Sequence, residues 1–233
     1  MSFNKARLKN RMLMFFVAGI WVVCCLIPFF ARAVTDETGR RVQVRPAPRR
    51  IVSLAPGITE TLYALGLEGK IVGVTTFCDW PAAAAAKTKI GGFTNPSIEK
   101  IVSLRPDLIL ATADGNRRET VRQLEKLGLP VYVTNPTSTS GVLKSIGHIG
   151  AITGREKEAA ALVEKLRQKL RSVAVRTRGK KKPRVFFQLG MEPMITAGRG
   201  TLIHEVIERA GGVNVAGNDV ANYPRYSAEG IIS

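Results

Sequence analysis

The chain has 233 residues, of which 45% are apolar, and it includes 22 Gly and 12 Pro. This composition suits one compact α/β unit or two small lobes, and it excludes a fibrous or a disordered chain. Lys and Arg total 35 against 18 Asp and Glu, so the formal net charge is +17, which can favour nucleic acid, anionic lipid or an anionic solute. The densest basic cluster, residues 176–184, carries no aromatic side chain, whereas nucleic-acid binders interleave the two kinds. We therefore expect a solvated helix end and linker there, and no nucleic acid as partner.

The first 33 residues have the three parts of an export signal. Residues 5–11 are basic, Met12–Phe30 is an almost unbroken apolar stretch, and Ala31-Arg32-Ala33 matches the A-x-A cleavage pattern. We predict a cleavable signal peptide at residues 1–33 and a mature protein that begins at Val34. An uncleaved membrane anchor is the alternative, because the apolar stretch is near the lower length limit of a spanning helix.

Short β-branched runs alternate with amphipathic stretches from residue 51 to residue 133. A period of two predicts a strand, and an apolar period near 3.6 predicts a helix. The predicted strands are Ile51–Leu54, Ile71–Val74, Leu108–Ala111 and Val131–Val133, and the predicted helices are Ile58–Leu65, a short one opened by Pro81, Ser97–Leu104 and Arg117–Leu127. Strands separated by helices imply a parallel sheet that is covered on both faces.

Two helices without an intervening strand follow, and then the strand–helix alternation resumes. The predicted helices are Val142–Ile152 and Glu156–Val175, and the later elements are strands at Val185–Leu189 and Ile195–Ala197 and a helix at Leu202–Arg209. We therefore predict an α/β fold of two Rossmann-like lobes with parallel sheets, joined by one long helix. The predicted boundaries are an N-terminal lobe at 34–140, a helical linker at 141–182 and the start of a C-terminal lobe at 183–233.

A seven-residue repeat supports pseudosymmetry between the lobes. Residues 97–103 and 227–233 share Ser, Glu, Ile and the final Ser, and each copy is placed at the start of a predicted helix. The second copy is the last segment of the chain, with no strand after it. We therefore expect the C-terminal lobe to be truncated.

Candidates for a catalytic or metal-binding set are few. His148 and His204 each lie in an apolar helical stretch, and neither has a partner at metal-ligand spacing. Gly198-Arg199-Gly200 lacks the third glycine of a dinucleotide fingerprint, and the sequence contains no phosphate-binding loop. We predict that the protein is not an enzyme and has no catalytic residue, no metal site and no resident cofactor.

Aromatic residues follow the predicted strands and favour a binding function. Phe77 and Trp80 follow the strand Ile71–Val74, Phe93 follows a short apolar segment, and Tyr223 lies in a loop of the second lobe. Open α/β sheets bind ligands at the carboxyl ends of their strands, where aromatic rings supply apolar contact area. We predict that these four side chains contact a ligand, although one or two of them could instead pack onto their own lobe.

Glu99 and Glu229 occupy the first turns of the two helices that the repeat opens. A carboxylate there is favoured by the helix dipole, which alone would explain both residues. The functional alternative is that they form one docking point per lobe for a basic partner.

Several segments, taken together, identify a family resemblance. They are residues 50–56 (Arg-Ile-Val-Ser-Leu-Ala-Pro), Asp79-Trp80-Pro81, and residues 104–109 (Leu-Arg-Pro-Asp-Leu-Ile). They resemble the periplasmic cobalamin- and iron-siderophore-binding proteins, which are the substrate-binding proteins of ABC importers with two lobes joined by a single helix. The resemblance covers residues 49–233, and residues 79–81 and 185–188 look most like the cobalamin-binding branch.

The resemblance implies a periplasmic monomer that holds its ligand in the cleft between the lobes. The ligand is cobalamin or a similarly bulky ferric complex, which is transported cargo and not a cofactor. Trp80, Phe93 and Tyr223 match the family's ligand contacts. Glu99 and Glu229 match the positions that meet arginines of the two ABC permease subunits in the inner membrane.

Two departures from the family's pattern leave the ligand open. Thr112 stands where cobalamin-specific relatives carry an aromatic residue, and Leu189 and Ile195 lie where another is expected. A related corrinoid, a ferric siderophore or haem are therefore alternatives, and Arg199 and Arg225 favour an anionic siderophore. A membrane-tethered sensor or scavenging module with the same fold is a further alternative if residues 12–30 are not cleaved.

Overall fold

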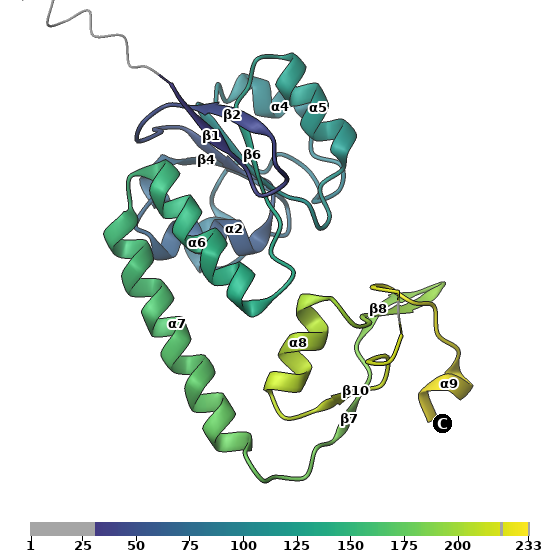
Figure 1. The fold of residues 1–233 in the computed structure, drawn as a ribbon. Helices are drawn as coiled ribbons and strands as arrows, with labels where there is room; N and C mark the ends of the chain where they lie inside the picture. Colours follow the sequence, from purple (N-terminus) through teal and green to yellow (C-terminus); the bar gives the residue numbers. More distant parts are fainter. Residues whose placement is uncertain (1–30, 220, 233) are drawn as a thin grey trace, which may run out of the picture.

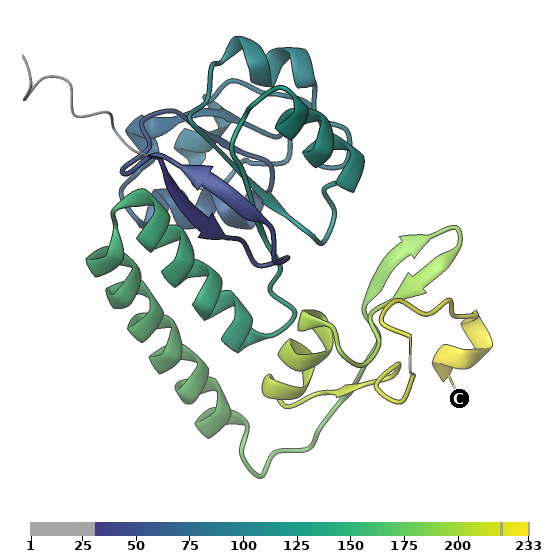
Figure 2. The same ribbon diagram turned by 45° about the horizontal axis from the view of Figure 1, so that its top comes forward.

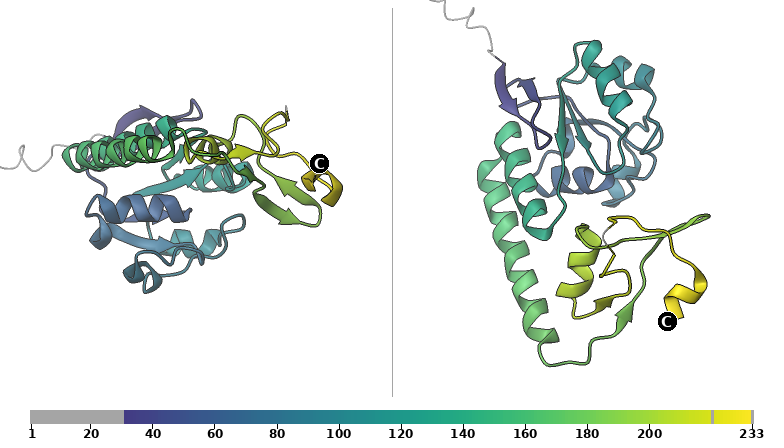
Figure 3. Two further views of the ribbon diagram at one scale, coloured as in Figure 1. Left: turned by 90° about the horizontal axis from the view of Figure 1, so that it is seen from below. Right: turned by 45° about the vertical axis from the view of Figure 1, so that its right-hand side comes forward.

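The computed structural model describes residues 31–219 and 221–232, which form two lobes connected by the long helix α7 (Glu156–Thr177) (Figure 1). Both lobes lie on the same side of α7, as the views in Figure 3 show. The predicted α/β fold, with two lobes and one long connecting helix, is confirmed. Residues 1–30 of the predicted signal peptide lie outside the described residues.

A four-stranded parallel sheet forms the centre of the first lobe, with the strand order β4-β3-β5-β6. Its strands are β3 (Ile51–Ser53), β4 (Ile71–Val74), β5 (Leu108–Thr112) and β6 (Val131–Thr134). β3 pairs in parallel with both β4 and β5, and β5 pairs in parallel with β6. All four strands predicted for this lobe are present, and their parallel pairing places the four carboxyl ends at one edge of the sheet.

Helices cover both faces of this sheet, because both faces are apolar. α2 (Pro56–Ala64), α6 (Thr139–Thr153) and the first half of α7 cover one face; α4 (Ile98–Ser103) and α5 (Arg118–Lys126) cover the other. In β5, Leu110 packs into the first cluster and its neighbour Ile109 into the second, as the two-residue period of a strand requires. A short 3-10 turn, η1 (Glu68–Lys70), and the four-residue helix α3 (Ala82–Ala85) complete the lobe.

An antiparallel hairpin of β1 (Arg32–Thr35) and β2 (Arg41–Val44) precedes the sheet and was not predicted from the sequence. Val42 and Val44 alternate with exposed neighbours and pack into the first cluster. Cleavage after Ala33 would leave Val34 and Thr35 paired with β2.

The helices α6 and α7 pack side by side and antiparallel (Figure 1). α6 ends at Gly154, whose left-handed backbone (φ 70°) reverses the chain before α7 begins. The helices approach closely at Gly150, where a Cβ atom would lie 2.4 Å from Cβ of Ala159. Only the first half of α7 is buried against the first lobe, through Ala159 and Val163.

The second lobe contains a parallel pair, an antiparallel hairpin and two helices. β7 (Arg184–Val185) pairs with β10 (Val213–Asn214), β8 (Gln188–Met191) pairs with β9 (Met194–Thr196), and the helices are α8 (Leu202–Arg209) and α9 (Ala228–Ile232). The single strand predicted at Val185–Leu189 is wrong, because the chain leaves β7 and folds back at residues 192–193 into a hairpin that projects from the lobe (Figure 2). Thr196 Oγ1 holds the base of this hairpin by donating to Phe187 O at 2.8 Å.

Within residues 31–219 and 221–232, no helix is both long and apolar enough to cross a membrane. The apolar stretch Met12–Phe30 lies outside those residues.

Two glycines of α6 give a matched stability test of the α6–α7 contact. Gly150→Ala should lower the free energy of unfolding by about 1–3 kcal/mol, because the new methyl group overlaps Ala159. Gly147→Ala should raise it by about 0.5–1 kcal/mol, because a Cβ there meets no atom within 4 Å and alanine favours a helix. Urea unfolding of both variants measures the difference, and equal effects would contradict the close packing at Gly150.

Candidate functional site

A cavity of about 320 Å³ lies between the lobes, at the carboxyl edge of the parallel sheet. The loops after β3 and β5 contribute Pro56 and Asp114, α6 contributes Val142 and Ile146, and Leu202 of α8 contributes from the second lobe. This edge is where open α/β sheets bind ligands, and a mainly apolar lining of this size is typical of small-molecule sites.

Phe93 is the predicted aromatic residue that lines this cavity. Its ring is partly buried, packs against the first hydrophobic cluster, and lies against the backbone of Gly115. A Cβ atom on Gly115 would be 1.9 Å from Cε1 of Phe93, and Gly115 has a φ of +116°, so the position requires glycine. Phe93 is thus held by its own lobe while one side of the ring faces the cleft.

Asn116, which the sequence analysis did not single out, fixes the loop between β5 and α5. Its buried amide donates to Phe93 O at 2.7 Å and to Leu54 O at 3.0 Å, and its Oδ1 accepts from the backbone N–H of Thr112 at 2.8 Å. One side chain therefore joins three segments of the cavity wall. The turn Asp114-Gly115-Asn116 was the available signal, because these residue types favour turns and local hydrogen bonds.

Tyr223 reaches the first lobe from the second. Its hydroxyl donates to Asp114 Oδ2 at 3.2 Å, and 46% of the residue is exposed. Burial, the negative charge of Asp114 and this hydrogen bond together raise the pKa of Tyr223, so the phenol stays protonated at neutral pH. The structure therefore brings Tyr223 to the 112–116 loop, which also holds Phe93, but Tyr223 does not line the cavity and its ligand contact stays a prediction.

Phe77 and Trp80 lie in the loop after β4, at the same edge of the sheet, but they do not line the cavity. They are 62% and 68% exposed, while Cys78 between them is buried and contacts Thr59 and Thr75 through its Sγ. Pro81 is the N-cap of α3, so the short helix that it opens begins at Ala82. The ligand contacts assigned to Phe77 and Trp80 stay predictions.

Glu99 and Glu229 are exposed in the first turns of α4 and α9, as their sequence positions predict. Ser97 Oγ accepts from Lys100 N at 3.3 Å, and Ser227 Oγ accepts from Gly230 N at 3.2 Å, so both helices begin with a serine cap. Their role in docking stays a prediction.

Each of the two histidines has a polar side chain within hydrogen-bond distance of its ring. His148 Nδ1 lies 3.0 Å from Glu37 Oε1, and His204 Nδ1 lies 3.2 Å from Nδ2 of Asn214. Among the described residues, no group of three or more His, Cys, Asp or Glu side chains is arranged to hold a metal ion.

A carboxylate on α8 ties the lobes together beside the cavity. Glu205 accepts from Thr139 Oγ1 at 2.7 Å and from Thr139 N at 2.8 Å, so a side chain of the second lobe caps the first turn of α6. Burial raises the pKa of Glu205, but the hydrogen bonds from Thr139 and Arg209 lower it by more, and the net pKa is below its usual value of 4.5. This contact was also missed, because its partner lies 66 residues away.

A two-lobed α/β molecule with an apolar cavity between its lobes is a solute-binding protein in its architecture. The model of the family described as "Periplasmic binding protein" matches residues 51–233, and the chain belongs to that family. The vitamin B12-binding protein of Yersinia pestis (strain Pestoides F) is 30% identical over 187 residues, which cover 80% of this chain and 67% of that protein.

Solved structures agree with this assignment. The periplasmic vitamin B12 binding protein BtuF of Vibrio cholerae has a TM-score of 0.69 and 30% identity, over 80% of this chain and 73% of its own. A periplasmic heme binding protein from Pseudomonas aeruginosa has a TM-score of 0.70 and 29% identity, over 78% and 67%. These relatives are substrate-binding proteins of the ABC importer class and not enzymes, which confirms the prediction that this chain is not an enzyme.

The Glu205–Thr139 contact predicts a pH-dependent stability difference. Glu205→Gln should lower the free energy of unfolding at pH 7 by about 1–2 kcal/mol, because the amide carries no charge and offers Thr139 one acceptor in place of two. Folding lowers the pKa of Glu205, so its contribution is complete above pH 4.5 and is lost as the pH falls through the lowered value.

Urea unfolding at pH 7 and at pH 3 measures this difference, with the exposed Glu60→Gln as the control. A gap between wild type and Glu205→Gln that is as wide at pH 3 as at pH 7 would contradict the assignment.

Proposed function

We propose that this chain is exported to the periplasm, binds cobalamin or a similarly bulky metal complex between its lobes, and passes it to the permease subunits of an ABC importer. The observation that carries the proposal is the position of the inter-lobe cavity, at the carboxyl edge of the sheet with Leu202 facing it from the other lobe. The resemblance to vitamin B12-binding proteins supports the ligand class.

The chemistry of the walls suits a large ligand with an apolar body and polar edges. Phe93 and Ile146 offer apolar surface, while Asp114, Thr112 and Ser145 contribute polar groups to the lining of the same cavity. The exposed rings of Phe77 and Trp80 at the same sheet edge would extend this surface beyond the cavity itself.

Haem is the second candidate, favoured by the similarity to heme-binding proteins and by Thr112 at a position where an aromatic would contact a corrinoid. Tyrosinate is one of the ligands that haem iron takes from proteins. The hydroxyl of Tyr223 already donates to Asp114 Oδ2 at 3.2 Å, and Tyr223 does not line the cavity. This geometry is the argument for ranking the corrin complex above haem.

Delivery to the permease would use Glu99 and Glu229. Both carboxylates are exposed, one in each lobe, and neither lines the cavity. They can therefore meet a basic partner without touching the ligand.

Titration of the mature chain with cyanocobalamin tests the ligand. Trp80 is the only tryptophan after residue 33, so its fluorescence should change saturably on binding. Trp80→Ala should weaken binding by about fivefold, because one stacked aromatic ring contributes on the order of 1 kcal/mol.

Absorbance follows the variant, which lacks the fluorescent probe. The matched control is Leu127→Ala, an exposed apolar residue at the end of α5, which should leave affinity unchanged. Saturable binding of hemin without binding of cyanocobalamin would favour the second candidate. Unchanged affinity in Trp80→Ala would remove this residue from the site.

The docking carboxylates predict a separation of binding from transport. Glu99→Ala/Glu229→Ala should bind ligand normally and lose most transport in vesicles that contain the permease, because two rim charges orient a basic partner. Glu119→Ala, which removes an exposed acid from the first turn of α5, is the matched control. Normal transport by the double variant would contradict the docking role.

A further inference from the structure

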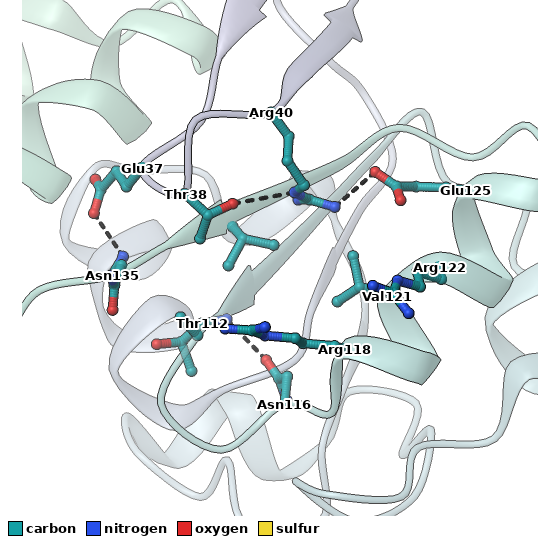
Figure 4. A pocket seen from close by; sticks show the side chains of 12 residues that line it. Glu37, Thr38, Arg40, Thr112, Asn116, Arg118, Val121, Arg122, Glu125 and Asn135 are labelled. Carbon is teal, nitrogen blue, oxygen red and sulfur yellow. Dashed lines mark hydrogen bonds and ion pairs between the residues drawn. The ribbon is translucent and has the colours of Figure 1, made fainter.

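A second and larger cavity, of about 610 Å³, lies in the first lobe (Figure 4). The β1–β2 turn, the ends of β5 and β6, and α5 enclose it, and three arginines and two glutamates line it: Arg40, Arg118, Arg122, Glu37 and Glu125. Thr112 is the only residue that lines both this cavity and the one between the lobes.

The carboxylates at this cavity already have partners. Arg40 binds Glu125 Oε1 through Nη1 at 2.6 Å and Asp36 Oδ2 through Nε at 3.0 Å. Glu37 accepts from Asn135 N and from Ser145 Oγ, each at 2.7 Å. Asp36 and Glu125 thus neutralise Arg40, and the carboxylate of Glu37 is bound by Asn135 and Ser145.

The side chains of Arg118 and Arg122 form no hydrogen bond or ion pair with any residue in the described part of the chain. They are four positions apart on α5, so they share one face of the helix. Figure 4 shows Arg118 extending along the cavity toward Thr112, while Arg122 lies beside Val121.

The backbone adds to the positive charge of this face. α5 begins at Arg118, and Arg117 at its N-cap supplies no side-chain acceptor for the first-turn N–H groups. The 112–116 loop, which forms part of the cavity wall, is held by the hydrogen bond from Thr112 N to Asn116 Oδ1.

We propose that this cavity binds a small organic or inorganic oxyanion, a carboxylate or a phosphate, through the guanidinium groups of Arg118 and Arg122. Each guanidinium can donate two parallel hydrogen bonds to such a group. The site is separate from the inter-lobe cleft and does not depend on which ligand the cleft holds.

Calorimetric titration with citrate and with inorganic phosphate at low ionic strength tests the proposal. We expect one anion per chain, and a Kd that rises at least about tenfold in Arg118→Gln/Arg122→Gln. Arg118→Lys/Arg122→Lys should show an intermediate Kd, because lysine keeps the charge but loses the two-pronged geometry. Binding of citrate alone would assign a carboxylate ligand, and binding of phosphate alone a phosphate ligand.

The matched control is Lys180→Gln/Lys181→Gln, which removes two exposed positive charges in the linker after α7. This variant should bind the anion as the wild type does. Equal weakening in both Gln variants, or no binding of either anion by the wild type, would overturn the proposal. Cyanocobalamin titration of Arg118→Gln/Arg122→Gln should be unchanged, so failure here is distinct from failure of the cleft assignment.

Discussion

Strands β3 and β5 lie in the middle of the first lobe's sheet, and burial of their two apolar faces is the requirement that organises the molecule. Val52 and Ile109 face one cluster and Ile51 and Leu110 the other, so helices must cover both sides. Helical crossovers make the strands parallel, and parallel strands end at one edge. The carboxyl edge of the sheet is where the cavity lies, and Leu202 of the second lobe faces it.

The loop from Thr112 to Asn116 turns this edge into a site. The amide of Asn116 holds Phe93 on one side and the end of β5 on the other, and Asp114 in the same loop meets Tyr223 of the second lobe. These hydrogen bonds therefore fix the position of the residues that line a mainly apolar cavity. The same loop also forms the floor of the arginine-lined cavity, so one backbone segment shapes two chemically different spaces.

The sequence was sufficient for elements whose signal is local. The apolar run of β5, the serine caps of α4 and α9, and the helical period of α7 each depend on neighbours within a few residues, and all were predicted. The β1–β2 hairpin was missed because its strands have only four residues each and most of those residues are exposed. The apolar run at Val185–Leu189 was predicted as one strand because composition does not show where a chain folds back.

The residues around the candidate site divide in the same way. The place of Phe93 at the cavity could be predicted because the ends of the strands are where α/β folds bind ligands, and its contact with a ligand stays a prediction. Asn116, Asp114 and Glu205 were not predicted, because their partners lie 23 to 109 residues away and only the folded chain brings them together.

The helix α7 is packed against the first lobe along only half of its length, and this affects how the lobes can move. Ala159 and Val163 pack the first half of the helix against the first lobe. The second half extends past that lobe and contacts α8 of the second lobe (Figure 1). About 21 Å of helix lies beyond Val163, and a bend of about 5° would displace its end by about 1.8 Å. Glu205 of α8 accepts two hydrogen bonds from Thr139 at the first turn of α6, and it thereby joins the second lobe to the first. A wider separation of the lobes would have to break these two hydrogen bonds and the one from Tyr223 to Asp114.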